Sequence, residues 1–263
     1  MITLLFLGDI VGEPGRDAAA RFVRRVQKER GIDFVIANGE NAAGGRGITS
    51  KLAIELLRSG VAVITTGDHI WDQKETAGYI PTEPRLLRPA NYPEGVPGQG
   101  SIVLETARGR VAVLNLQGRT FMNSPLENPF PMAVDLVEQL REETPVIFVD
   151  FHAETTSEKI AMGLVLDGKV SAVVGTHTHV QTADEKILPG GTAFLCDAGM
   201  CGPENSILGR DPRNIIKRFF NSMPTSFPIA GGPVRVCGAI IEVDETTGHA
   251  MSIRRVSEIV REE

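Results

Sequence analysis

Carboxylate, amide and imidazole side chains recur directly after short apolar runs of this chain. They lie in the segments Gly8-Asp9, Asn38-Gly39-Glu40-Asn41, Gly67-Asp68-His69, Asp150-Phe151-His152 and Gly175-Thr176-His177-Thr178-His179. Among the histidines, only His249 lies outside these segments. Imidazole and carboxylate together suit borderline cations such as manganese, iron and zinc. The first hypothesis is therefore a metal centre built from residues that are far apart in the sequence.

The apolar runs are predicted to be the strands that position these residues. β-branched runs alternate with stretches whose apolar residues fall at helical spacing. The predicted strands are 2–7, 33–38, 61–66, 145–151 and 170–176, and the predicted helices are 15–29, 50–59, 132–142 and 157–166. This alternation indicates an α/β fold with a largely buried sheet. Because ligands of such sheets bind beyond the carboxyl ends of the strands, the polar residues are expected to converge on one crevice.

The remaining residues add strands but no second domain. Residues 100–105 and 110–116 flank Arg108-Gly109-Arg110 and predict a hairpin. Three later segments are strand-like, namely 192–197, 234–243 and 249–256. No internal repeat, low-complexity segment or linker interrupts the chain, so a single domain over residues 1–263 is expected.

The composition argues against several classes of protein. A net charge of -6 and a pI near 5.5 disfavour a general nucleic-acid-binding protein. The run at 2–7 lacks a basic leader and ends at a carboxylate, which favours a strand over a signal peptide, and no stretch approaches the roughly 20 apolar residues of a membrane span. Cys196, Cys201 and Cys237 lack the spacing of a disulfide framework or a thiolate zinc site. A cytoplasmic protein without a membrane partner is expected.

Each polar segment also has a plain structural interpretation. Asp9 could be a helix N-cap, Gly39-Glu40-Asn41 could be a turn, and His152 alone could be a hydrogen-bonded structural histidine. The coincidence of such residues at successive strand ends favours the metal interpretation. His177 and His179 would face the same side of an extended segment or, at a bend, reach two neighbouring metals.

The series of motifs resembles the calcineurin-like metallophosphoesterases and, more closely, their YmdB-type branch of 2',3'-cyclic-nucleotide 2'-phosphodiesterases. The likeness is carried by LGDIVGEPGR, ANGENAAGGRGIT, TTGDHIWDQKE, NLQGRTFM, DFHAETTSEK, GTHTHVQTAD and DAGMCGP, which extend over residues 7–203. Their order and spacing match over most of the chain. The resemblance implies a layered α/β/β/α sandwich in a single domain.

The resemblance also implies two metal ions per chain. The implied ligands of one ion are Asp9, Glu40, Asn41 and His179, and those of the other are Glu40, Asp68, His152 and His177, with Glu40 bridging. The ions would activate a shared water as the hydroxide that attacks phosphorus, and His69 would be the general acid for the leaving group. Iron or manganese is expected, with zinc or magnesium as alternatives.

Two positions depart from the wider superfamily. Its Asp-x-His motif corresponds to Asp9-Ile10-Val11 here, so the usual histidine ligand is missing. The YmdB branch also lacks this histidine, and Asn41 is the expected replacement ligand. Its Gly-Asn-His motif is Gly67-Asp68-His69. Asp68 can still ligate through oxygen, but its negative charge favours a harder or more highly charged ion.

Candidates for substrate contacts rest on single residues. Arg119 could bind phosphate through its planar guanidinium or be a solvated loop cation. Trp71 and Phe121 could stack on a base or pack in the core. Arg46 and the glycines at 44, 45 and 47 suggest an anion-binding loop, although they do not match the phosphate-binding P-loop.

The leading hypothesis is hydrolysis of a small-molecule phosphodiester, namely 2',3'-cyclic and also 3',5'-cyclic nucleotides. The alternatives are a phosphomonoesterase acting on nucleotides or phosphoproteins, and a nucleotide-binding regulatory protein with residual activity. The sequence contains no G-x-S-x-G motif of a serine hydrolase, and no G-x-G-x-x-G follows the first strand. A homo-oligomer is compatible with the sequence but has no residue-level support.

Overall fold

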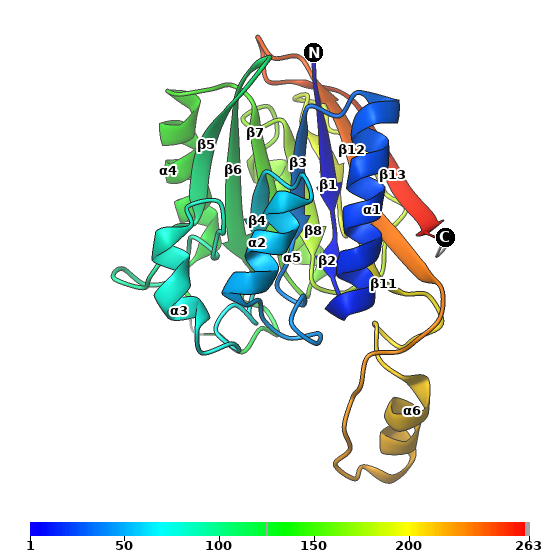
Figure 1. Cartoon of the computed structure of the whole chain (residues 1–263). Coiled ribbons are helices and arrows are strands. Elements are labelled where there is room, and N and C mark those ends of the chain that lie inside the picture. Colours follow the sequence, from blue (N-terminus) through cyan, green and yellow to red (C-terminus); the bar gives the residue numbers. More distant parts are fainter. Residues whose placement is uncertain (125, 261–263) are drawn as a thin grey trace.

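The computed structural model describes residues 1–124 and 126–260 as two β-sheets packed face to face, with helices against both outer faces (Figure 1). The layered α/β/β/α sandwich that the motifs imply is therefore confirmed. None of the helices in this described part of the chain has the length and hydropathy of a membrane span.

The first sheet carries the N-terminal strands. Its members are β1 (Ile2–Leu7), β2 (Asp9–Ile10), β3 (Phe34–Asn38), β4 (Val63–Thr65), β11 (Met200–Pro203), β12 (Val234–Val243) and β13 (Ala250–Val260). The strands follow the order β2-β11-β12-β1-β3-β4, and β13 pairs with the outer side of β12. Since β1, β3 and β4 are parallel, their carboxyl ends lie at one edge of the sheet.

The second sheet repeats this arrangement. Its members are β5 (Ser101–Thr106), β6 (Gly109–Gln117), β7 (Ile147–His152), β8 (Ala172–Thr176), β9 (Lys186–Ile187) and β10 (Ala193–Leu195), in the order β5-β6-β7-β8-β10-β9. The inner strands β6, β7, β8 and β10 are parallel, and β5 and β9 are antiparallel edge strands.

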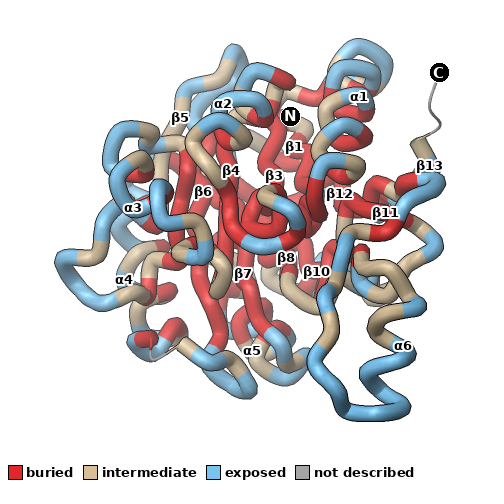
Figure 2. Tube along the Cα trace, turned by 60° about the horizontal axis from the view of Figure 1, so that its bottom comes forward, coloured by how far each residue is buried: buried red, intermediate tan, exposed pale blue. Residues whose placement is uncertain are grey.

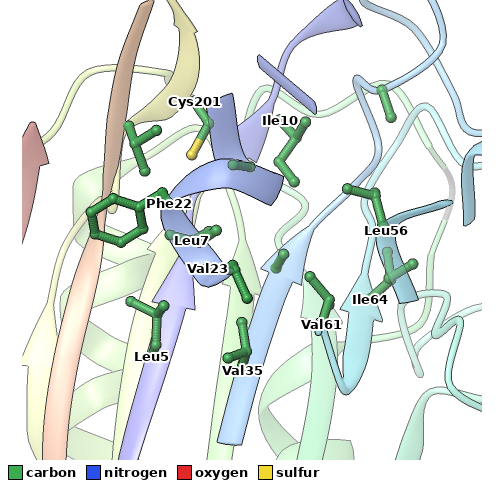
Figure 3. Close-up of a cluster of buried hydrophobic side chains, with 14 of the residues drawn as sticks. Leu5, Leu7, Ile10, Phe22, Val23, Val35, Leu56, Val61, Ile64 and Cys201 are labelled. Atoms are coloured by element: carbon green, nitrogen blue, oxygen red, sulfur yellow. The ribbon is translucent and has the colours of Figure 1, made fainter. Parts of the chain in front are cut away.

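Alternation of side chains along β1 explains the layers. Leu5 and Leu7 pack towards α1 (Gly12–Arg30) and α2 (Ser50–Arg58), and Figure 3 shows both in the same cluster as Phe22 of α1. Leu4 and Phe6 point the other way, into the layer between the sheets. This period of two buries both faces of the strand, which is why the run 2–7 is apolar except for Thr3.

The second sheet is covered in the same way by α4 (Pro129–Arg141) and α5 (Thr156–Val165). Val149 and Phe151 of β7 pack under these helices, whereas Phe148 lies between the sheets with its ring centroid 4.9 Å from that of Phe6. Figure 2 shows the result as a buried interior of strands under a more exposed surface.

A segment that leaves this core was missed by the sequence prediction. Residues 207–230, called the α6 lobe below, contain α6 (Pro212–Asn221), which projects from the end of the sandwich where β1 and β3 finish (Figure 1). No residue of α6 is buried, although its apolar residues Ile215, Ile216, Phe219 and Phe220 recur at helical spacing. Asp211 caps α6 by accepting from Arg213 N, and Pro212 follows, so both the spacing and the cap were available signals.

The other predicted elements are present within a few residues of their expected bounds. Apart from α6, the prediction omitted only short elements. These are β2, β9, β11, α3 (Thr76–Tyr79) and the 3-10 turn η1 (Ile80–Thr82). Such pieces are too short to show a period, and their neighbours in space decide their conformation.

Phe148→Ala tests the contact between the sheets. Removing the ring should lower the free energy of unfolding by about 3–5 kcal/mol, because the cavity can close only partly. Urea unfolding followed by circular dichroism measures this change. The control Phe121→Ala, at a ring that is 85% exposed, should change stability by less than about 0.5 kcal/mol. Equal effects of the two changes would contradict this assignment of the core.

Candidate metal centre

The residues predicted as metal ligands meet where the parallel strands of both sheets end. In the first sheet, Asp9 follows β1, Glu40 and Asn41 follow β3, and Asp68 follows β4. In the second sheet, His152 ends β7, and His177 and His179 follow β8. Asp9 is not a helix cap, because α1 has Val11 at its N-cap position and no side-chain cap. The structure thus brings the predicted ligands together, and their coordination of metal stays a prediction.

The first donor group consists of Glu40, Asp68, His152 and His177, each of which offers one ligand atom within 4.8 Å of the others. His152 Nε2 lies 3.2 Å from Glu40 Oε1 and 3.2 Å from Asp68 Oδ1. His177 Nδ1 lies 3.0 Å from His152 Nε2 and 3.5 Å from Asp68 Oδ1. Oxygen and nitrogen donors that face one point are able to hold a divalent cation.

The second donor group adjoins the first and consists of Asp9, Glu40, Asn41 and His179. Asn41 Nδ2 lies 3.3 Å from Asp9 Oδ1, 3.1 Å from Glu40 Oε1 and 3.2 Å from His179 Nε2. Rotation of this amide by half a turn puts Oδ1 at the same point, so Asn41 is able to offer an oxygen ligand. Glu40 belongs to both groups, as a bridging carboxylate must.

The chain bends sharply at His177 and His179. Their φ angles are 101° and 65°, a region that residues other than glycine rarely adopt. The bend sends His177 to the first donor group and His179 to the second, so the two rings do not face the same side of an extended segment. Such backbone strain is maintained only where the surroundings fix it.

A buried ion pair fixes this bend. Asp197 Oδ2 accepts hydrogen bonds from Thr178 N at 3.1 Å and from Thr178 Oγ1 at 2.7 Å. Lys159 Nζ of α5 donates to the same oxygen at 2.7 Å, and both Lys159 and Asp197 are buried. Loss of either charge would leave the other buried and unpaired, which is costly.

Hydrogen bonds also set the orientation of His152. The hydroxyl of Thr176 donates to Asp150 Oδ1 at 2.7 Å and lies 2.9 Å from His152 Nδ1. Because that hydroxyl has one hydrogen, it must accept from His152 Nδ1–H, and Nε2 keeps its lone pair for the donor group. Burial raises the pKa of Asp150 to about 6, so its carboxyl is mostly ionised at neutral pH and accepts these bonds.

The charges of the two donor groups fit cations. Among the described residues, the ion-pair partners of Asp9, Glu40 and Asp68 are imidazoles, and none is a lysine or arginine. Burial raises the pKa of Asp9 against the attraction of His179. Burial would also raise the pKa of Glu40, but the charge of His152 holds it below its ordinary value. A metal is able to replace the protons that balance these carboxylates.

His69, the predicted general acid, lies beside the donor groups rather than in them. Its Nδ1 lies 3.1 Å from Asp72 Oδ2, and Arg46 Nε lies 2.8 Å from that same oxygen. Asp72 therefore orients the ring, and His69 Nε2 makes no hydrogen bond within the described residues. Asp72 was not singled out from the sequence, because a carboxylate three residues away has no special pattern.

A cavity of about 670 Å³ opens above both donor groups. Its walls include Glu40, Asn41, His69, His177 and His179, and also Gly45, Arg46 and residues of the α6 lobe. This volume suits a drug- or nucleotide-sized ligand.

Other candidates from the sequence lie away from this cavity. Arg119 and Phe121 are exposed and are not among its lining residues. Trp71 packs edge-on against Tyr92, with ring centroids 5.8 Å apart, next to the core under α2. Glu154, which the sequence reasoning missed, does line the cavity and lies 3.1 Å from His177 Nε2. The Glu154 carboxylate therefore helps to fix the orientation of the His177 ring through Nε2.

The two sheets pack face to face, and carboxylates and imidazoles gather at the ends of their parallel strands. This combination is that of a metallophosphoesterase, an enzyme that hydrolyses phosphate esters. Comparison with known proteins narrows this class. The family model described as YmdB-like protein matches residues 5–256, and the chain belongs to that family.

Similar proteins support the same placement. The chain is 49% identical over 253 residues to the 2',3'-cyclic-nucleotide 2'-phosphodiesterase of Bacillus subtilis (strain 168), a match that covers 96% of each sequence. A crystal structure of a hypothetical protein from Thermus thermophilus matches with a TM-score of 0.91 at 36% identity, over 98% of this chain and 99% of that one. That of a novel phosphatase from Mycoplasma pneumoniae matches with a TM-score of 0.91 at 34% identity, over 98% and 93%.

Gly67→Ala tests the donor groups without removing a ligand. A Cβ at Gly67 would collide with the His152 ring and the Glu40 carboxylate and displace both. We expect metal affinity to fall by at least about tenfold, measured by elemental analysis after equilibration at limiting metal. Gly78→Ala is the control, because a Cβ there meets open space. A full metal complement in Gly67→Ala would contradict the proposed centre.

Proposed function

We propose that this chain is a two-metal phosphodiesterase that hydrolyses 2',3'-cyclic nucleotides. The observation that best supports this is the pair of adjoining donor groups, which share Glu40 and face one cavity of nucleotide size. The Bacillus subtilis relative is named for the same substrate.

The proposed ligands are those of the two donor groups, with Glu40 as the bridge. Bound cations would lower the pKa of a water and neutralise phosphate oxygens. The mixture of imidazole with carboxylate favours iron or manganese over magnesium, which prefers oxygen ligands alone. Asp68 adds a negative charge to the first donor group and favours the more highly charged ion.

The chain's own acid is His69. In hydrolysis, an oxygen–phosphorus bond forms with water, and the bond between phosphorus and the ribose 2'-oxygen breaks. The departing oxygen needs a proton, and we assign its delivery to His69 Nε2 at the cavity wall, while Asp72 lies against Nδ1 and orients the ring. The proton that the attacking water gives up balances the one delivered to the leaving oxygen. The product of such cleavage is a nucleoside 3'-phosphate.

His69→Ala should lower kcat by about 10²–10⁴-fold, because proton donation to the leaving oxygen is lost. Metal content should stay near normal, since His69 is in neither donor group. Elemental analysis and steady-state kinetics measure the two quantities. His249→Ala, at the exposed histidine far along the chain, is the matched control and should leave both unchanged. An equal loss of metal and activity in His69→Ala would refute its role as the acid.

A substrate panel tests the proposed function itself. On the metal-loaded enzyme, we expect 2',3'-cyclic AMP to be hydrolysed to 3'-AMP, with 3',5'-cyclic AMP also accepted, and chelation to abolish both reactions. Chromatography of the products measures the outcome.

The same panel includes 4-nitrophenyl phosphate and bis(4-nitrophenyl) phosphate. Faster turnover of the monoester would favour a phosphomonoesterase, an alternative supported by the name of the Mycoplasma pneumoniae structure. A metal-loaded protein that binds nucleotide and hydrolyses no ester would favour a regulatory binding protein.

A further inference from the structure

The cavity above the donor groups has a second wall that the proposed chemistry does not use. It is formed by the α6 lobe, through Ile207, Leu208, Arg210, Ile215, Arg218, Phe219 and Phe227. Figure 1 shows this lobe standing beyond the ends of the sheets. One continuous cavity therefore extends from the donor groups to a wall of apolar and basic side chains.

The spacing of α6 turns one face of the helix to the cavity. Arg218 and Phe219 lie three and four positions after Ile215, which puts them on the same face of the helix, and all three line the cavity. Phe220, one residue further along, does not. The Phe219 side chain is 78% exposed and Phe220 is 89% exposed, so neither ring stabilises the core. What distinguishes Phe219 is its place on the cavity wall.

The other aromatic ring of this wall is already engaged. The guanidinium of Arg218 lies 5.2 Å from the centroid of Phe227, in a cation–π contact. Arg218 forms no ion pair or side-chain hydrogen bond within the described residues. Phe219 is thus the open ring, next to a cation that suits an anionic ligand.

The lobe is held at a fixed place over the donor groups. Arg210 donates to Gly44 O at 2.9 Å, to Gly45 O at 2.6 Å and to Phe227 O at 3.0 Å. This side chain ties the lobe to the glycine-rich loop that follows Asn41. A ring carried on a fixed wall loses little freedom when a ligand stacks on it.

We propose that the α6 lobe binds the nucleoside part of the substrate and that Phe219 stacks on its base. This inference rests on the proposed function, because it assumes that the ligand of the donor groups is a nucleotide. Phosphate at the donor groups would leave the base directed along the cavity to Phe219. Stacking tolerates every base, since each has a π face, so the lobe selects nucleotides over base-free esters.

The test compares 2',3'-cyclic AMP with methyl riboside 2',3'-cyclic phosphate, which has the same cyclic diester and no base. In Phe219→Ala, the ratio of kcat/KM for the nucleotide to that for the base-free ester should fall about tenfold, through KM. Phe220→Ala is the matched control and should keep the wild-type ratio. Phe219→Trp should restore it, because indole also stacks.

An unchanged ratio in Phe219→Ala, or an equal fall in Phe220→Ala, would overturn the inference. A shift of molecular mass by light scattering in both variants would also overturn it, in favour of a contact between copies of the chain. If the wild-type enzyme hydrolyses neither diester, the proposed function fails. Calorimetry with 3'-AMP then decides the inference: a loss of about tenfold in affinity in Phe219→Ala alone supports it, and equal affinities reject it.

Discussion

The negative charges of Asp9, Glu40 and Asp68 lie side by side at the strand ends and must be balanced by positive charge. In the described part of the chain, none of the three pairs with a lysine or arginine. Asp9 and Glu40 are almost fully buried, and Asp68 is mostly so. Like charges at such distances repel strongly where water is excluded. Imidazoles relieve this repulsion only when they are protonated. Bound cations, as proposed above, would relieve it and leave the imidazoles neutral, as ligands must be.

The two-sheet architecture is what makes such a concentration of charge possible. Parallel strands put all their carboxyl ends at one edge, and two such sheets packed face to face put two edges together. Hydrogen bonds between the layers support the result: Asp150 of β7 accepts from Thr65 of β4 and from Asn38 of β3. Asn38 in turn accepts from Glu40 N at 3.1 Å. The layer between the sheets thus carries a network of polar side chains next to the donor groups.

What the sequence predicted follows from local pattern. Asp9, Glu40 and His152 come directly after apolar runs, so strand ends and polar residues were visible together. The supports of these residues were not visible, because they pair across space. Lys159 and Asp197 are 38 positions apart, and nothing in either segment marks a buried ion pair.

The bend at His177 and His179 was left open by the sequence for a related reason. Thr178 between them is held by Asp197, a contact across space that supports the positive φ values on either side and that no local pattern marks. Single aromatic and basic residues proved equally hard to place. Trp71 lies against the core and Arg119 on the surface, because neither has a neighbouring pattern that fixes its direction.

The proposed function and the proposed base-binding lobe assign chemistry and selectivity to different parts of the chain. The donor groups are built into the ends of core strands, so a change there disturbs both packing and charge. The α6 lobe contributes no residue of α6 to the core, and Arg210 ties it to the glycine-rich loop through Gly44 O and Gly45 O. Its cavity face can differ in side chain without cost to the sandwich. Under the proposed function, the donor groups would contact only the phosphate atoms that all phosphate esters share, so a preference for a particular ester would have to come from a wall such as the α6 lobe.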